Sequence, residues 1–142
     1  MHFIIGGSFN GKAVWVTRQY AEEKASWHSA YKGECFPEAA DAATDCFILE
    51  GIEQWIREDI KRMDKDPARA LWKERLDDWL RWEAGVQERK LVLIGTDITK
   101  GIVPMEKEDR DWRDASGWIF QDAAAAAERV DLIWYGISRT LK

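Results

Sequence analysis

The sequence has few of the residues that support disulfide, zinc or histidine chemistry. Its 142 residues include two cysteines, Cys35 and Cys46, and two histidines, His2 and His28, without a CxxC motif or a cluster of metal-ligand spacing. A disulfide framework or a structural zinc site is therefore not expected, and a reducing compartment is the default. Neither histidine has a serine or cysteine partner at a recognisable spacing, so the sequence does not support a catalytic triad.

Long apolar runs and an excess of positive charge are also lacking. The first apolar stretch, Phe3–Ile5, ends at two glycines and is too short for a signal peptide or a membrane span. The net charge of −5 argues against nonspecific nucleic-acid binding, which needs a basic surface. We expect a cytoplasmic protein with no nucleic acid and no membrane span, folded as a single domain over residues 1–142.

Tryptophan, in contrast, is abundant, with nine residues in this short chain. Each tryptophan buries a large area, so most of them are expected to fill the interfaces between a sheet and its helices. The alternative is that one or two stack on a flat ligand.

Apolar runs alternate along the chain with segments of helical periodicity. The runs Phe3–Ile5, Cys46–Leu49 and Leu91–Ile94 are typical of strands buried on both faces of a parallel sheet. Val130–Ile137 predicts a longer strand, and Ala25–Tyr31 gives a weaker strand signal. The helical segments are Lys12–Lys24, Ile52–Met63, a long helix capped by Asp66 with Pro67 at its first position, and Asp122–Val130. This alternation indicates a layered α/β fold.

A glycine-rich turn follows the first apolar run and suggests phosphate binding. The segment GGSFNGK fits the pattern G-x-x-x-x-G-K, in which backbone N–H groups cradle phosphates and the lysine supplies a mobile charge. The candidate nucleotide-binding residues are Gly6, Gly7, Ser8, Phe9, Asn10, Gly11, Lys12 and Ala13. The alternative is a tight strand-to-helix turn with an exposed lysine.

Ala13 stands where a hydroxyl normally coordinates the magnesium that bridges the outer phosphates. Thr17 lies one helical turn further on and is a poor substitute. Glu50 ends the run CFILE, which is expected to lie beside the loop, and its carboxylate could hold Mg²⁺ or accept a proton from an acceptor hydroxyl. Lys12 and Glu50 are thus the candidate catalytic residues. The alternative for Glu50 is an acid at a helix N-terminus.

A charged segment follows the third apolar run and contains Asp97, Arg110 and Arg113. These residues are candidates for contacts with phosphates or an anionic substrate, because the ends of parallel strands gather ligands and arginine recognises phosphate. The alternative is a solvated face of alternating charge.

The C-terminal stretch resembles the adenosylcobinamide kinase/adenosylcobinamide-phosphate guanylyltransferase family. The matching features are Gly101–Pro104, the pattern Arg110-x-Trp112-Arg113-Asp114, Gly117, Gln121, the alanine run with Val130, and the ending from Gly136 to Lys142. GGSFNGK stands where that family has its phosphate loop, and FILEG is similar to its acidic second-strand motif. The likeness thus covers both ends and the middle of the chain.

This resemblance implies a P-loop NTPase-like, three-layer domain with a mostly parallel sheet and a role in cobalamin assembly or salvage. The family phosphorylates the aminopropanol hydroxyl of cobinamide and then transfers GMP from GTP through a guanylylated histidine. By position, Gly6–Lys12 would bind the phosphates of ATP or GTP, and Glu50 would contact the nucleotide or its Mg²⁺. The charged loop after Pro104 corresponds to Glu106–Asp114. A small symmetric homo-oligomer is also implied.

The sequence departs from the family at important positions. Ala13 replaces a serine or threonine, and Thr96-Asp97-Ile98 replaces Asn-Glu-Val. The stretch between Lys12 and Glu50 is short, and the shortening falls where full-length members carry the nucleophilic histidine, so guanylyl transfer is not expected. Three hypotheses remain: a kinase of this family, a nucleotide-binding relative with little catalysis that acts as a partner or regulator, and a tryptophan-rich interaction domain.

Overall fold

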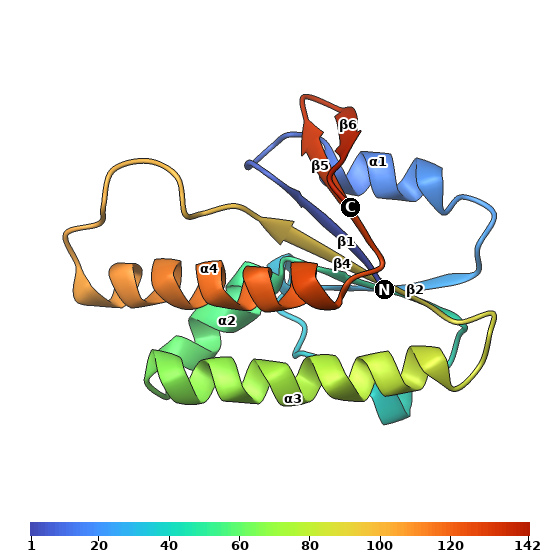
Figure 1. The fold of residues 1–142 in the computed structure, drawn as a ribbon, viewed down its shortest axis with the longest axis horizontal. Helices are drawn as coiled ribbons and strands as arrows, with labels where there is room; N and C mark the ends of the chain where they lie inside the picture. The colour runs from blue at the N-terminus through green and yellow to red at the C-terminus, as the bar shows by residue number, and fades with distance from the viewer.

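A single six-stranded sheet organises the computed structural model, which describes residues Met1 to Lys142. Its strands are β1 (His2–Gly6), β2 (Ala25–Ser29), β3 (Cys46–Glu50), β4 (Lys90–Thr96), β5 (Arg129–Trp134) and β6 (Ile137–Thr140). The strand order is β2-β3-β4-β1-β5-β6, and every neighbouring pair is parallel except β5 and β6 (Figure 1). The predicted α/β fold with a mostly parallel sheet is confirmed.

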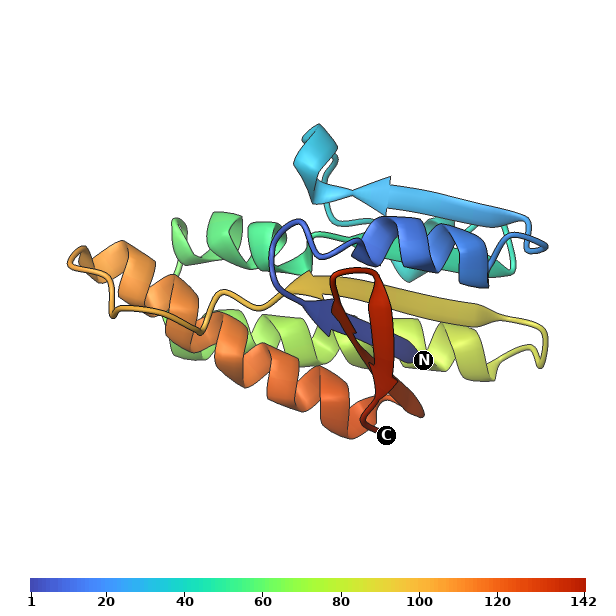
Figure 2. The same cartoon turned by 90° about the horizontal axis from the view of Figure 1, so that it is seen from above.

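Helices cover both faces of the sheet, but unequally. They are α1 (Lys12–Gln19), α2 (Ile52–Ile60), α3 (Lys65–Ala84) and α4 (Lys107–Ala126), with short 3₁₀ turns at Ala30–Lys32 and Ala39–Asp41. Helices α2, α3 and α4 lie together on one side, while α1 lies on the other (Figures 1 and 2). Strand side chains alternate accordingly between two clusters, with Phe3 facing the three helices and Ile4 facing α1.

The larger cluster contains Trp55, Trp72 and Trp79, and Trp82 and Trp112 pack against it, so five of the nine tryptophans lie in this core as the composition led us to expect. Trp72 and Trp79 of α3 are almost fully buried, and Trp55 of α2 lies beside them in the same core. Their indole N–H groups find acceptors within the chain, including the Asp59 carboxylate for Trp72 and the Glu34 carbonyl for Trp55. These rings therefore bind the helices to the sheet without leaving buried polar atoms unpaired.

Several predicted boundaries are wrong. The strand expected over Val130–Ile137 is instead a hairpin, because Tyr135 (φ 51°) and Gly136 (φ 77°) adopt left-handed conformations that turn the chain back. Helix α1 ends at Gln19 rather than Lys24.

The two long helices also differ from expectation. Helix α3 begins at Lys65 with Asp64 in the N-cap position, so the expected cap Asp66 lies inside the first turn. The charged and alanine-rich stretches form one helix, α4, which ends at Ala126, before the predicted Val130. Proline and alanine signals located these elements, but the terminal residues of both helices differ from those expected.

A buried polar cluster lies at the amino ends of the strands. His2 contacts the Tyr20 hydroxyl through Nδ1 and Asp131 Oδ2 through Nε2, both at 2.7 Å. Asp131 is fully buried and also accepts from Thr140 Oγ1 at 2.6 Å, while Arg129 pairs with its Oδ2. Burial lowers the pKa of His2 and outweighs the opposing hydrogen bond to Asp131. The cluster therefore favours a neutral imidazole.

Candidate functional site

The glycine-rich loop connects β1 to α1 at the carboxyl end of the sheet. Phe9 (φ 59°) and Gly11 (φ 84°) adopt left-handed backbone conformations, and the loop closes with a hydrogen bond from Asn10 N to Gly7 O. The β5–β6 turn holds it from outside, because Gly136 N donates to Asn10 O at 2.8 Å and Tyr135 N to Asn10 Oδ1 at 3.1 Å. The loop is thus anchored to a second part of the chain.

Backbone N–H groups of this loop are unused within the chain. Those of Ser8, Phe9 and the segment Gly11–Val14 donate to no other protein atom. The last of them belong to the first turn of α1, whose dipole adds positive potential at the same place. Consecutive free N–H groups at a helix N-terminus form an anion-binding arrangement.

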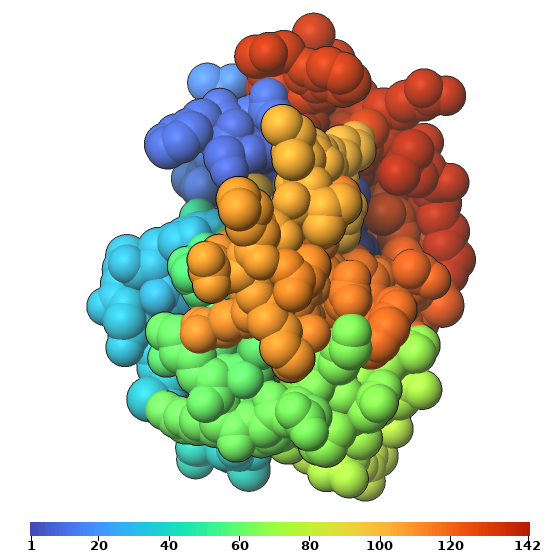
Figure 3. All heavy atoms as spheres, turned by 90° about the vertical axis from the view of Figure 1, so that its left-hand side faces the viewer, coloured from blue at the N-terminus to red at the C-terminus, as the bar shows by residue number.

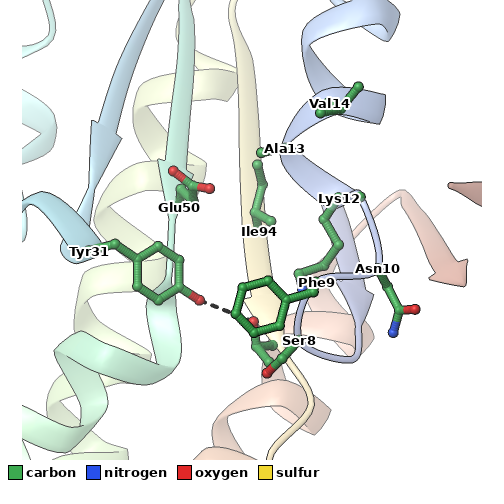
Figure 4. Close-up of a pocket in the computed structure, with 11 residues that line it drawn as sticks. Ser8, Phe9, Asn10, Lys12, Ala13, Val14, Tyr31, Glu50 and Ile94 are labelled. Atoms are coloured by element: carbon green, nitrogen blue, oxygen red, sulfur yellow. Dashed lines mark hydrogen bonds between the residues drawn. The ribbon is translucent and has the colours of Figure 1, made fainter. Parts of the chain in front are cut away.

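A cavity of about 470 Å³ opens over these N–H groups. The loop forms one wall, and Tyr31, Glu50, Ile94 and Thr96 from the segments after and within β2, β3 and β4 complete it (Figure 4). Phe9 and Tyr31 approach from opposite sides in this view, and Phe9 is fully exposed. In Figure 3 the same edge brings together the loop, the segment after β2 and the segment after β4.

Lys12 is buried and points back along the loop. Its Nζ donates to Gly7 O at 2.8 Å and to Gly6 O at 3.3 Å. Burial lowers the pKa of Lys12, while the negative charges of Glu53 and Glu50 oppose that shift. The ammonium therefore lies between loop carbonyls and two acids, with no counterion in direct contact.

Gly6 leaves no room for a side chain next to this lysine. A Cβ atom built on Gly6 would lie 2.3 Å from Ile133 O of β5 and 3.5 Å from Lys12 Cδ. The close approach of β1 and β5, rather than an unusual φ, thus requires glycine at this position.

Glu50 lines the cavity together with the loop, so the run CFILE ends beside the loop as expected. Its strand β3 is not a direct neighbour of β1, because β4 pairs with both strands and lies between them. Glu50 Oε2 accepts a hydrogen bond from Trp27 Nε1 at 3.0 Å. One edge of the carboxylate is therefore held while the residue remains part of the cavity wall.

A cluster around Glu53 was not found from the sequence. Glu53 is only 1% exposed and accepts from Thr96 N at 2.9 Å and from the Tyr31 hydroxyl. The Tyr31 oxygen also lies 3.1 Å from Thr96 Oγ1, so two hydroxyls face the cavity together. Burial and the Glu53 carboxylate raise the pKa of Tyr31, which keeps the phenol protonated. The sequence signal that could have located this cluster is Glu53 itself, an acid on the buried face of the amphipathic helix α2.

Ala13 lines the cavity but offers only a methyl group beside its free N–H. Thr17 does not replace the missing hydroxyl, because its exposed Oγ1 donates to Ala13 O at 2.9 Å. No group of three or more His, Cys, Asp or Glu side chains is arranged to hold a metal ion. Glu50 is the one carboxylate in the cavity wall, which fits Mg²⁺ held mainly by phosphates and water.

Asp97, Arg110 and Arg113 do not join this cavity. Asp97 N donates to Gly6 O, but its side chain caps Thr99. Burial raises the pKa of Asp97, but the hydrogen bonds from Thr99 and nearby Lys100 outweigh it and hold the pKa below its ordinary value. Arg110 donates to the carbonyl oxygens of Pro104 and Met105.

Arg113 and Asp97 instead line a separate groove against α4. The expectation that Asp97, Arg110 and Arg113 contact phosphates or an anionic substrate stays a prediction, but none of the three lines the loop cavity. The segment after β4 runs outward before α4 begins (Figure 1).

The two histidines are also remote from the loop cavity. His28 stacks on Phe47, with ring centroids 4.8 Å apart, and its Nδ1 lies 3.6 Å from Glu34. His2 lies in the buried cluster at the opposite edge of the sheet. Neither residue is part of the cavity wall.

A mostly parallel sheet with helices on both faces and a strand–glycine loop–helix at its carboxyl edge defines a P-loop NTPase-like α/β protein. The family model for cobinamide kinase / cobinamide phosphate guanyltransferase matches residues 16–141. The chain therefore belongs to this family. The glycine-rich loop precedes the matched residues. A comparison with curated proteins gave no match. No helix is both long enough and apolar enough to cross a membrane.

Proposed function

We propose that this protein binds ATP or GTP and phosphorylates the aminopropanol hydroxyl of a cobinamide. The observation that carries the proposal is the set of unused backbone N–H groups at Ser8, Phe9 and Gly11–Val14, in residues that line the cavity. Membership of the cobinamide kinase / cobinamide phosphate guanyltransferase family supplies the substrate class. The family uses nucleoside triphosphates, and the choice between ATP and GTP is left to experiment.

Phosphate binding would require Lys12 to exchange its partners. Its Nζ, which now donates to Gly6 and Gly7 carbonyls, would turn to phosphate oxygens, where a charge-assisted hydrogen bond is stronger than a neutral one. The free loop N–H groups would hold the phosphates without further rearrangement. Together these donors would stabilise the charge on the transferred phosphoryl group.

The acceptor hydroxyl would attack the γ-phosphorus while the bond to the β–γ bridging oxygen breaks, and the nucleoside diphosphate would leave with that oxygen. Glu50 is the carboxylate of the cavity wall and would accept the acceptor's proton or help to hold Mg²⁺. Mg²⁺, when bound, would neutralise developing phosphate charge. No histidine lines the cavity, so we do not propose guanylyl transfer through histidine.

The test is the transfer of labelled γ-phosphate from ATP or GTP to cobinamide by wild type and Lys12→Ala. Arg18→Ala is the matched control, because Arg18 is an exposed cation on the same helix. We expect turnover in wild type and the control and a loss of more than tenfold in Lys12→Ala. Equal background rates in all three proteins would reject the kinase.

Ala13 favours a second candidate, a nucleotide-binding relative with little catalysis that regulates or accompanies other cobalamin enzymes. The methyl group of Ala13 cannot coordinate Mg²⁺, and the hydroxyl of Thr17 donates to the carbonyl of Ala13. Calorimetry with GTP and ATP, with Mg²⁺ or with a chelator, separates the two. Tight nucleotide binding with the same affinity in Mg²⁺ and in chelator, without turnover, supports the nucleotide-binding relative. No nucleotide binding at all would reject both candidates.

A further inference from the structure

A second groove, of about 500 Å³, lies on the other side of β1 from the nucleotide cavity and shares no residue with it. Its base is apolar and includes Phe3 and Ile5, and Trp118, Phe120 and Leu141 extend the apolar lining. In Figure 3 a hollow with the N-terminal strand at its base separates the segment after β4 from the C-terminal segment. The volume is in the range of small-molecule sites.

Arg113 is the unusual residue of this groove. Its guanidinium forms no ion pair and donates no hydrogen bond within the chain, although the residue is half-buried and Nη1 is completely so. Buried guanidinium groups are normally paired, because an unpaired buried donor loses its interactions with water. An unpaired cation beside an apolar floor is therefore a charge without its counterion.

The acids that line the groove are already engaged. Asp97 is capped by Thr99 and lies 3.5 Å from Lys100 Nζ, while Asp114 Oδ2 accepts from Lys65 at 2.8 Å. Neither acid is paired with Arg113. The uncompensated charge facing the apolar floor is thus positive.

We propose that this groove binds an amphipathic organic anion, in which a carboxylate or phosphate pairs with Arg113 and an apolar body covers Phe3, Ile5 and Trp118. Charge complementarity selects the head group, and the apolar lining selects the body. The site is independent of the nucleotide cavity. Asp97, which lines the groove, donates its N–H to Gly6 O at the start of the glycine-rich loop.

The test is calorimetry with octanoate, octyl phosphate, neutral octanol and inorganic phosphate. We expect octanoate or octyl phosphate to bind at least tenfold more tightly than octanol or inorganic phosphate, and the comparison of the two octyl anions identifies the head group. Arg113→Met keeps the apolar stem and should weaken the octyl anion at least tenfold without changing octanol binding. Arg110→Met is the control, because Arg110 caps loop carbonyls and does not line the groove.

Two further measurements keep the test decisive. If Arg113→Met proves poorly folded, Arg113→Lys takes its place: it retains the positive charge, so it should preserve part of the affinity for the octyl anion. Lys12→Ala should bind the octyl anion like wild type, which distinguishes this groove from the nucleotide cavity. Equal affinity of the octyl anions for wild type and folded Arg113→Met, or equal affinity of octanol and both octyl anions, would overturn the proposal.

Discussion

Replacing Ala13 with serine would separate phosphate recognition from the use of a metal. Ala13 lines the cavity directly after Lys12, at the position whose hydroxyl coordinates Mg²⁺ in phosphate loops. Thr17 cannot take this role while its Oγ1 donates to the carbonyl of Ala13. The change adds one oxygen next to a free backbone N–H and removes no contact on which the loop depends.

The expected magnitude follows from the added contact. A hydroxyl bound to a cation is comparable to a hydrogen bond to a charged group, about 1.5–3 kcal/mol, which corresponds to roughly a tenfold to a hundredfold change in affinity. Serine is a weaker helix former than alanine by about 0.5 kcal/mol, so stability should change little. Affinity should therefore rise with Mg²⁺ present and stay the same in a chelator.

The assay is calorimetry of GTP and ATP with wild type, Ala13→Ser and Val14→Ser, each with and without Mg²⁺. Val14→Ser is the control, because Val14 also lines the cavity but does not occupy the metal-ligand position. If Ala13→Ser shows the same Mg²⁺ dependence as wild type, the loop does not place a nucleotide as we propose, and the argument from Ala13 fails.

Three predictions concern stability and are measured by denaturant unfolding. Gly6→Ala should lose about 3 kcal/mol, at the upper end for overpacking, whereas Gly117→Ala, which adds an ordinary contact, should be neutral or slightly stabilising; equal effects would contradict the close approach at Gly6. Glu53→Ala leaves the buried N–H of Thr96 and the part-buried hydroxyl of Tyr31 without their acceptor and should cost about 2 kcal/mol, against almost nothing for exposed Glu58→Ala; a cost near zero would show that water replaces the carboxylate. Folding lowers the pKa of His2 from its ordinary value of 6.5, so just below pH 6.5 the unfolded chain binds more protons than the folded chain. The free energy of unfolding should therefore be highest above pH 6.5 and decrease as the pH falls below it. His2→Gln should reduce this pH dependence.

The sequence was sufficient for the parts of the fold that local chemistry determines. Fully apolar runs marked the strands at Phe3–Ile5, Cys46–Leu49 and Leu91–Ile94, because both faces of a covered parallel strand are buried. The glycine pattern located the loop for a similar reason, since it depends on consecutive residues. The hairpin after Val130 was missed because Tyr135, a residue that rarely takes a positive φ, makes half of its turn.

The remainder of the site depends on strand order, which no local pattern encodes. Tyr31 and Thr96 meet at Glu53 because β2, β3 and β4 are neighbours and the first turn of α2 follows directly after β3. The same order inserts β4 between β1, which precedes the loop, and β3, which ends at Glu50. Arg113 was expected to contact phosphates or an anionic substrate because its segment follows a strand end. In the structure the segment after β4 runs outward (Figure 1), and Arg113 lines the second groove rather than the loop cavity.

The glycine-rich loop is held by contacts with the β5–β6 turn, and this has a consequence for affinity. The contacts of Asn10 with Gly136 and Tyr135 hold the backbone in shape, so little conformational entropy is lost when phosphates bind. Lys12, in contrast, must give up two hydrogen bonds to loop carbonyls, which opposes binding. This cost is partly offset because burial disfavours the charged form of Lys12 in its present position. The free energy of phosphate binding therefore has two parts. One is the gain from hydrogen bonds to the free loop N–H groups, and the other is the difference between a phosphate oxygen and a carbonyl oxygen as the partner of the Lys12 ammonium. Because phosphate is the better partner for an ammonium, binding should raise the pKa of Lys12 and weaken as pH rises through the pKa of its free form.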